Sequence, residues 1–184
     1  MKSPSDIFEL LEHEHSIIKR MLKVIRERCK SIIEGNFMDK SEFAFIIDFI
    51  RNYADGHHHG KEEDILFTAM LEEKGLAAEK MIMAMNTEHD LGRAYVQRLE
   101  DALEKAGDGN KDALLDVIAN AVSYADLLER HIAKEDNVLY RYARIRLSQK
   151  TLDRIGKDFR RFESESALKG TKDKYIGLLD KIEN

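Results

Sequence analysis

The chain has 184 residues, 43% of them hydrophobic, which is enough for one domain with a real core and excludes bulk disorder. Its net charge of −5, from 35 acidic and 30 basic residues, argues against a nucleic-acid or anionic-membrane partner. No apolar run approaches the ~20 residues that span a bilayer, so we expect no membrane association. The single cysteine, Cys29, cannot form an internal disulfide, and the N-terminus lacks an apolar signal segment. These features predict a cytoplasmic protein.

One proline and many Leu, Ile, Ala, Glu, Lys and Arg residues are typical of long helices, so the predicted fold class is all-α. Apolar residues recur at alternating steps of three and four in four stretches: 8–32, about 40–74, 82–103 and 117–142. Four long helices with short connections predict an antiparallel up-down-up-down four-helix bundle. We expect residues 1–147 to form this bundle and residues 148–184 to form a C-terminal helical tail packed on it.

Each predicted helix carries one histidine on its apolar stripe. Counted at 1.5 Å per residue from the helix ends, all four histidines fall at a similar height in the bundle. In the second and fourth helices a glutamate follows one turn later, and an internal repeat supports this pairing, because HGKEED recurs as HIAKED. The predicted inward-facing set is His15, His59, Glu63, His89, His131 and Glu135.

The second helix contains three consecutive histidines and two consecutive glutamates, so its register decides which of them face the core. Counting back from the apolar Leu66 in steps of three and four places Glu63 and His59 inward. The neighbouring residues are then expected to lie nearer to solvent: His57, His58 and Glu62.

Four imidazoles and two carboxylates in a core would carry a large desolvation cost without a cation, so the set predicts a metal site. Two carboxylates that can bridge favour a pair of divalent ions over a single zinc. Because no thiolate takes part, we expect non-haem iron, with manganese or zinc as substitutes. Two irons joined by an oxo or hydroxo bridge, with Glu63 and Glu135 as bridging ligands, would keep positions for O₂, peroxide or NO.

The order His15, His59-x-x-x-Glu63, His89, His131-x-x-x-Glu135 resembles the hemerythrin-like (HHE cation-binding) proteins. The segments LEHEHSIIKRML, HHHGKEEDILF, TEHDLGRAYV and ERHIAKEDNVLY are also similar to that family, and the likeness covers about residues 6–145. This resemblance implies an antiparallel four-helix bundle with a non-haem di-iron centre. It further implies O₂ binding or storage, oxygen or redox sensing, or the handling of NO or peroxide.

Two positions depart from the oxygen-carrying members of that family. Those proteins place two histidines one turn apart on the third helix, whereas Met85 and Arg93 stand four residues from His89 here. Their fourth-helix carboxylate is an aspartate five residues after its histidine, whereas Glu135 is four residues after His131. We therefore expect a site with one imidazole fewer, which favours redox, peroxide or NO chemistry over reversible oxygen carriage.

Three functions stay open at this point. The first is a small-ligand binder, active in oxygen or redox sensing or in detoxification, that works with a separate protein redox or signalling partner. The second is a di-iron peroxidase or NO reductase. The third is a metal-storing or zinc-loaded interaction bundle.

Overall fold

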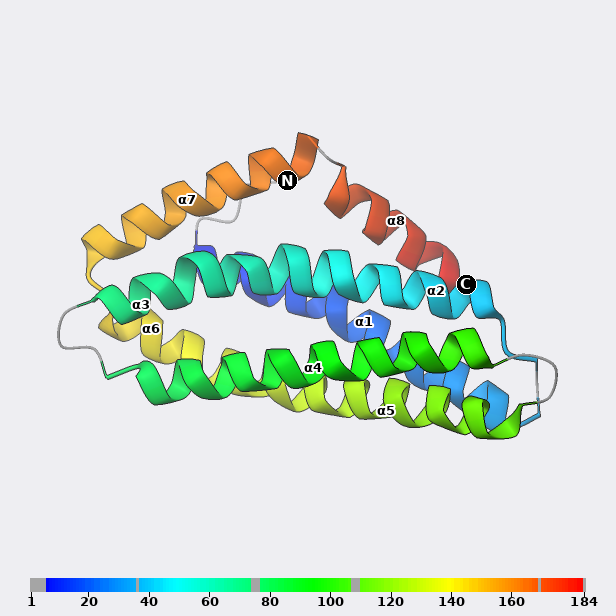
Figure 1. The fold of residues 1–184 in the computed structure, drawn as a ribbon. Coiled ribbons are helices and arrows are strands. Elements are labelled where there is room, and N and C mark those ends of the chain that lie inside the picture. Colours follow the sequence, from blue (N-terminus) through cyan, green and yellow to red (C-terminus); the bar gives the residue numbers. More distant parts are fainter. Residues whose placement is uncertain (1–5, 36, 74–76, 107–109, 169, 184) are drawn as a thin grey trace.

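A computed structural model describes residues 6–35, 37–73, 77–106, 110–168 and 170–183. Every regular element in these ranges is helical, which confirms the all-α fold class. Four long helical rods run side by side and are joined at alternating ends, and two further helices lie across them (Figure 1).

The rods are formed by the following elements. The first and third rods are single helices, α1 (Ile7–Ile33) and α4 (Glu79–Lys105). The second rod, residues 40–72, is continuous and joins α2 (Lys40–Phe49), the π-helices η1 (Ile50–His59) and η2 (Glu62–Phe67), and α3 (Thr68–Glu72). The fourth rod, residues 111–146, joins α5 (Lys111–Lys134), the π-helix η3 (Glu135–Leu139) and α6 (Tyr140–Arg146). The two crossing helices are α7 (Gln149–Leu168) and α8 (Thr171–Ile182).

Short polar side chains cap the N-termini of three of the rods. Asp6 accepts a hydrogen bond from the backbone N–H of Phe8, and Asp39 and Asn110 cap α2 and α5 in the same way. At the other end of α1, Gly35 has a φ of 90°, the left-handed conformation that glycine adopts most easily after a helix. Local sequence therefore fixes where these helices begin and where α1 ends.

The second rod keeps one face toward the core by advancing in steps of four residues. Ala54, His58, Glu62, Leu66 and Met70 are all buried. In a regular α-helix each step of four overshoots a full turn by about 40°, so four steps would rotate the face by about 160°. The i→i+5 hydrogen bonds of η1 and η2 add a residue to the turn and offset this drift. The alternation of three and four that the sequence suggested is therefore wrong for residues 54–70 of this rod.

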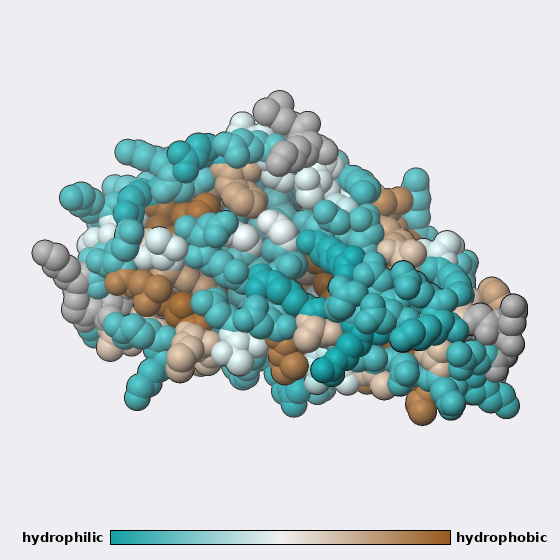
Figure 2. Space-filling model, viewed as in Figure 1, coloured by the Kyte–Doolittle hydropathy of each residue, from teal (hydrophilic) through white to brown (hydrophobic). Residues whose placement is uncertain are grey.

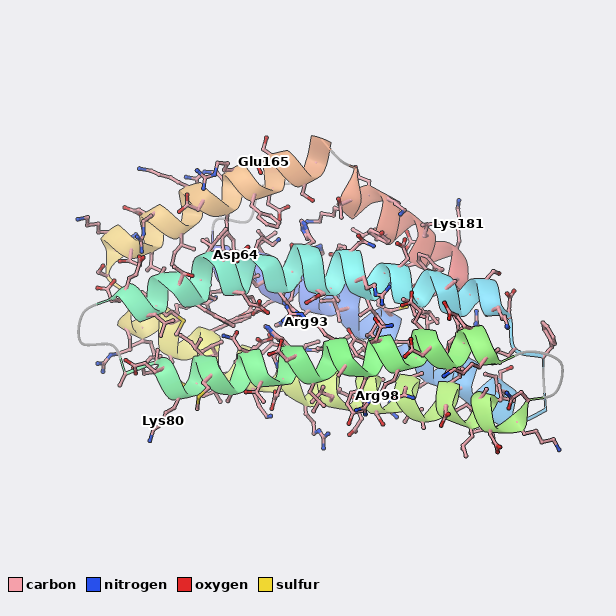
Figure 3. All side chains as sticks on the ribbon, viewed as in Figure 1. Asp64, Lys80, Arg93, Arg98, Glu165 and Lys181 are labelled. Carbon is pink, nitrogen blue, oxygen red and sulfur yellow. The ribbon has the colours of Figure 1, made fainter. Side chains whose placement is uncertain are left out.

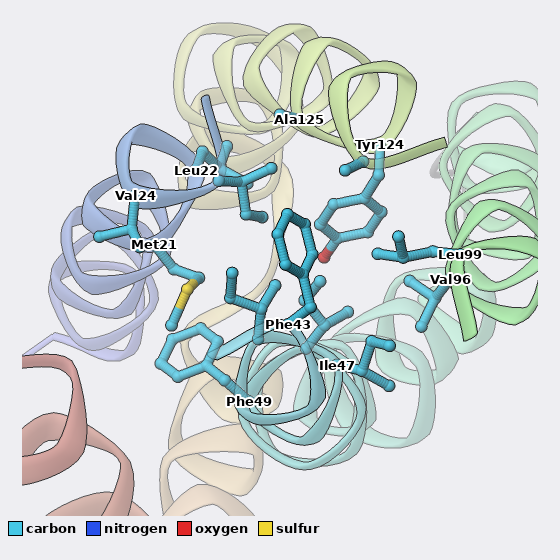
Figure 4. Packing of buried hydrophobic residues seen from close by; sticks show 14 of the residues in the cluster. Met21, Leu22, Val24, Phe43, Ile47, Phe49, Val96, Leu99, Tyr124 and Ala125 are labelled. Carbon is cyan, nitrogen blue, oxygen red and sulfur yellow. The ribbon is translucent and has the colours of Figure 1, made fainter. Parts of the chain in front are cut away.

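The apolar core consists of two clusters with a polar layer between them. The larger cluster includes Phe49 and Leu99 (Figure 4). Along α1, Leu11 belongs to the smaller cluster and Ile18 to the larger one, and His15 lies between them in the chain. The other rods repeat this order, with their polar residues between Ala54 and Leu66, between Met85 and Val96, and between Leu128 and Leu139.

The crossing helices cover one side of the rods. Helix α7 contacts α1 and η2, whereas α8 contacts α1 and η1. Phe159 of α7 belongs to the smaller apolar cluster, and Tyr175 and Leu179 of α8 belong to the larger one. Side chains of α7 and α8 therefore contribute to the apolar clusters of the rods.

The outer surface is mostly polar. Hydrophilic side chains dominate the face in Figure 2, and hydrophobic ones gather in only a few places on it. Within the described ranges, each helix is too short or too polar to span a bilayer.

Candidate metal centre

Side chains from all four rods meet in the polar layer and form two groups that share one glutamate. The atoms of each group that could hold a cation lie within 4.8 Å of one another. The three-imidazole group consists of His59, Glu62, His89 and His131. The two-imidazole group consists of His15, His58, Glu62 and Glu135.

Five of the six residues predicted from the sequence lie in these groups, and Glu63 does not. Glu62 takes the inward position, one residue earlier, and His58 joins it. The expectation that His58 and Glu62 lie near solvent is wrong, since their exposed fractions are 1% and 0%. His57 is also buried, at 2%. The physical reason is the π-helical register of the second rod.

His58 also corrects the expected number of imidazoles. The sequence places one histidine on each of the four apolar stripes and no second histidine one turn from His89 on the third rod. The structure supplies the fifth from the second rod, directly before His59 in the chain. The signal for it was present in the sequence, because Ala54, His58, Glu62, Leu66 and Met70 follow a strict step of four.

Glu62 and Glu135 lie between the two groups. Oε2 of Glu62 is 3.7 Å from Nε2 of His58 and 3.7 Å from Nε2 of His89. Oε1 of Glu135 is 3.0 Å from Nε2 of His131, while its Oε2 is 3.2 Å from Nε2 of His15. Each carboxylate therefore faces an imidazole of both groups, the arrangement that a bridging ligand needs.

Each of the five imidazoles pairs its Nδ1 atom with a carboxylate farther from the centre. Since an ionised carboxylate only accepts hydrogen bonds, Nδ1 carries the proton and Nε2 presents a lone pair. The pairs are His15–Asp136 at 2.6 Å, His58–Glu14 at 2.9 Å, His59–Asp55 at 3.2 Å, His89–Glu63 at 2.6 Å and His131–Glu88 at 3.0 Å.

Lone pairs therefore converge in the centre. The Nε2 atoms of His15 and His58 are 2.8 Å apart, and those of His89 and His131 are 3.0 Å apart. Oε2 of Glu62 and both carboxylate oxygens of Glu135 are buried without a hydrogen-bond partner. Such acceptors are costly to bury unpaired, and a cation satisfies them together. The donor set, imidazole nitrogen and carboxylate oxygen, fits a transition-metal ion.

Burial sets the charge state of several of these groups. It lowers the pKa of His58 to about 3 and that of His59 to about 4, so both rings are neutral. Burial alone would also lower the pKa of His15, but Asp136 and Glu135 raise it to about 9. In the metal-free protein His15 therefore carries a second proton, on Nε2, and a metal ion at this group would displace that proton to gain the Nε2 lone pair.

Glu63 was predicted from the sequence to face the centre, but in the structure it lies behind His89. It accepts the Nδ1 hydrogen of His89 and pairs with Arg93, whose Nη2 atom is 2.7 Å from its Oε1. The same guanidinium lies 2.8 Å from Asp55, which accepts the Nδ1 hydrogen of His59. Arg93 therefore holds both carboxylates that orient the imidazoles of His59 and His89.

A cavity of about 190 Å³ adjoins the three-imidazole group, between the second rod, α4 and α5. His59, His89 and Gly92 line it together with Tyr124, and Arg93 also contributes. A Cβ atom at Gly92 would meet the Tyr124 ring at 3.6 Å, an ordinary contact distance. The absence of a side chain at this position therefore leaves space beside two imidazoles.

Tyr140 closes the opposite, two-imidazole group. Its hydroxyl donates to Oε1 of Glu62 at 2.6 Å and lies 3.4 Å from Nε2 of His15, with the two rings stacked. Burial and the charges of Glu62 and Glu135 raise the pKa of Tyr140 well above its ordinary value. The phenol therefore keeps its proton beside the centre.

Sequence comparison agrees with this geometry. The family described as the hemerythrin HHE cation-binding domain matches residues 6–143, and the chain belongs to this family. It is also 25% identical over 132 residues to uncharacterized proteins of Mycobacterium bovis and of two strains of Mycobacterium tuberculosis. These matches cover 72% of this chain and 51% of each relative, so the chain spans about half their length. No solved structure gives a significant match.

Proposed function

We propose that this protein is a non-haem di-iron protein that binds O₂ or a related small ligand, NO or peroxide, in oxygen or redox sensing or in detoxification. The observation that carries the proposal is the convergence of five Nε2 lone pairs and unpaired carboxylate oxygens in a buried centre. Two cations, one in each group and bridged by Glu62 and Glu135, would satisfy all of these acceptors.

The ligand types support iron over other metals. Imidazole and carboxylate without thiolate suit iron, while manganese and zinc are the alternatives to exclude. Cys29, the one cysteine of the sequence, lies in the larger apolar cluster and belongs to neither group. A structural zinc would leave one of the two groups without a cation.

The proposed centre is suited to small ligands. Two ferrous ions held here would supply electrons and open coordination positions for O₂, NO or peroxide. The chain contributes a site with little water, because the exposed fractions of the seven grouped residues lie between 0% and 5%. The cavity beside His59 and His89 has room for a diatomic molecule or a peroxide but not for a large substrate.

The fifth imidazole changes the balance between the functions considered. The expectation of a nitrogen-poor site rested on a missing histidine, and His58 supplies it. A centre with five imidazoles would therefore be compatible with reversible ligand binding as well as with redox, peroxide or NO chemistry.

A di-iron peroxidase or NO reductase is the second candidate, and Tyr140 is the observation that favours it. Reduction of a small oxygen or nitrogen ligand consumes protons, and this phenol is a buried proton donor bound to Glu62. Steady-state turnover with a reductant separates the two proposals. An enzyme would show turnover that falls in Tyr140→Phe, whereas a binder or sensor would take up its ligand without turnover.

The proposal also includes the wider setting of the centre. Residues 1–147 would form the antiparallel up-down-up-down bundle of the family and residues 148–184 its packed tail. The protein would act in the cytoplasm, without nucleic acid or membrane, and would pass its signal or electrons to a separate protein partner.

Metal analysis after anaerobic purification tests the proposal. Protein loaded with Fe²⁺ should hold about two ions per chain, as in other two-metal sites. Exposure to air should then produce a near-ultraviolet absorption band from ligand-to-iron charge transfer. A single tightly bound zinc that iron does not displace would overturn the di-iron proposal in favour of a zinc-loaded bundle.

A further inference from the structure

A third set of potential ligand atoms lies beside the two-imidazole group, and a lysine occupies it. Glu14, His57 and Glu163 form this set. The Lys61 ammonium forms ion pairs with Glu14 and Glu163 and is 3.2 Å from Nε2 of His57. Lys61 is fully buried, and the set therefore already contains its cation.

This lysine is connected to the centre through one carboxylate. Oε2 of Glu14 accepts the Nδ1 hydrogen of His58 at 2.9 Å. Oε1 of the same carboxylate faces Lys61 and lies 3.2 Å from Nε2 of His57. Both oxygens of Glu14 are thus fixed, and the orientation of the His58 ring depends on them.

The other carboxylates that orient imidazoles are also held by cations. Lys19 pairs with Asp136, Lys134 with Glu88, and Arg93 with Asp55 and Glu63. These three cationic side chains are 40% to 50% exposed, so water solvates them. Lys61 is 0% exposed, and a buried ammonium needs anions in place of water.

Helix α7 supplies the second anion. Glu163 pairs with Lys61, and Ser166, one turn further along α7, lies 2.9 Å from Nδ1 of His57. The rings of Phe159 and Phe162 enclose the ammonium, with their centroids 6.0 and 5.8 Å from Nζ. The four α7 residues lie beyond residue 143, where the family match ends: Phe159, Phe162, Glu163 and Ser166.

From these contacts we infer that Glu163 and Lys61 are positioning residues of the metal centre, so that α7 docking and metal binding at the two-imidazole group stabilise each other. The path runs from Glu163 through Lys61 and Glu14 to the Nδ1 hydrogen of His58. This inference rests on the proposed metal centre, and by linkage the effect is reciprocal. A loaded centre holds α7 in place, and α7 in place strengthens metal binding.

Glu163→Gln tests the inference, because the amide keeps the shape of the side chain and removes its charge. The matched control is Glu165→Gln, an exposed carboxylate on the same helix that is labelled in Figure 3. The metal-free protein, with all 184 residues of this chain, is titrated with Co²⁺ under anaerobic conditions. We expect Glu163→Gln to weaken the ion of the two-imidazole group roughly tenfold, the effect typical of losing a group that orients a ligand histidine. Glu165→Gln should change binding by no more than about twofold.

Two further measurements separate positioning from general destabilisation. In Co²⁺-loaded protein, the shifted Nδ1–H proton resonances of the two-imidazole group, from His15 and His58, are those lost in His58→Ala. The resonance of His58 should exchange with solvent faster in Glu163→Gln, whereas that of His15, which is held by Asp136, should not change. Hydrogen exchange should show that Co²⁺ slows the amides of α7 more than those of α8 in the wild type. This metal-dependent protection of α7 should disappear in Glu163→Gln.

The outcomes are distinguishable. Wild-type affinity, an unchanged His58 proton and full α7 protection in Glu163→Gln would overturn the inference and leave the metal centre intact. Wild-type protein that binds no Co²⁺ would overturn the metal centre itself, and the inference with it.

Discussion

HGKEED in the second rod and HIAKED in the fourth both begin with a histidine and place an acidic residue four positions later, yet the two rods present different members of these segments to the centre. The fourth rod uses His131 and Glu135, as the repeat predicts. The second rod uses His59 but presents Glu62 in place of Glu63. Equivalent letters in a repeat therefore do not occupy equivalent positions when the helices that carry them differ.

The difference lies in the extent of π-helix in each rod. In the fourth rod, regular α-helix continues to Lys134, and η3 begins only at Glu135. In the second rod, η1 extends over ten residues and ends with His58 and His59, and η2 begins with Glu62. The wider turns let the consecutive residues His58 and His59 both face inward, one to each group. A short stretch of unusual helix thus supplies the fifth imidazole.

The strongest test of this comparison replaces each of the three glutamates by glutamine. Glu62→Gln and Glu135→Gln should each reduce anaerobic iron content from about two ions per chain to one or fewer, because an amide loses the charge and bridges poorly. Glu63→Gln should keep both ions, with affinity reduced roughly tenfold, since Glu63 only orients His89. Iron analysis of the three purified variants gives the answer. If Glu63→Gln lost the two iron ions and Glu62→Gln kept them, Glu63 would be the inward-facing glutamate, as the repeat predicts. The π-helical register of the second rod would then be wrong.

The adjacent histidines provide the next largest effect. His58→Ala should remove the ion of the two-imidazole group and leave about one iron per chain, because that group has only one other imidazole, His15. His57→Ala should retain two ions with weaker binding, because His57 acts through Glu14. His13→Ala, on the exposed face of α1, is the control and should match the wild type. Equal iron loss in His57→Ala and His58→Ala would contradict the different roles assigned to these two histidines.

Sequence reasoning succeeds where the helix is regular. The all-α class and the inward positions of His15, His89, His131 and Glu135 follow from a period that α1, α4 and α5 obey. It fails in the second rod, because the step of four from Ala54 to Met70 competes there with the steps of three and four that place Glu63 inward, and the sequence alone does not decide between these two registers. Contacts between residues far apart in the sequence could not be predicted from local patterns either. The Lys61–Glu163 pair joins residues 102 apart, and no local pattern connects them.

A smaller effect tests how the second rod and α4 cooperate at the three-imidazole group. Arg93→Met should weaken the ion at this group roughly tenfold, because Asp55 and Glu63 lose the guanidinium that holds them against His59 and His89. The ion of the two-imidazole group should be unaffected. Arg98→Met, an exposed arginine on the same helix (Figure 3), serves as the control. Competition with a chelator during iron titration measures both affinities, and an equal loss at the two groups would contradict this assignment.

The smallest effect concerns the cavity between the second rod, α4 and α5. Gly92→Ala should stabilise the protein by up to about 1 kcal/mol, because alanine favours a helix interior over glycine and its methyl group meets the Tyr124 ring at an ordinary distance. That gain corresponds to a rise in Tm of about 2–4 °C. The added group also reduces the space beside His59 and His89, so NO should bind more slowly to the iron-loaded protein, and more slowly still in Gly92→Leu. Stopped-flow absorbance measures the rates, with iron content as the check that the centre is intact. If Gly92→Leu bound NO as fast as the wild type at full iron content, ligands would reach the centre by another route, and the space beside the second rod would serve only packing.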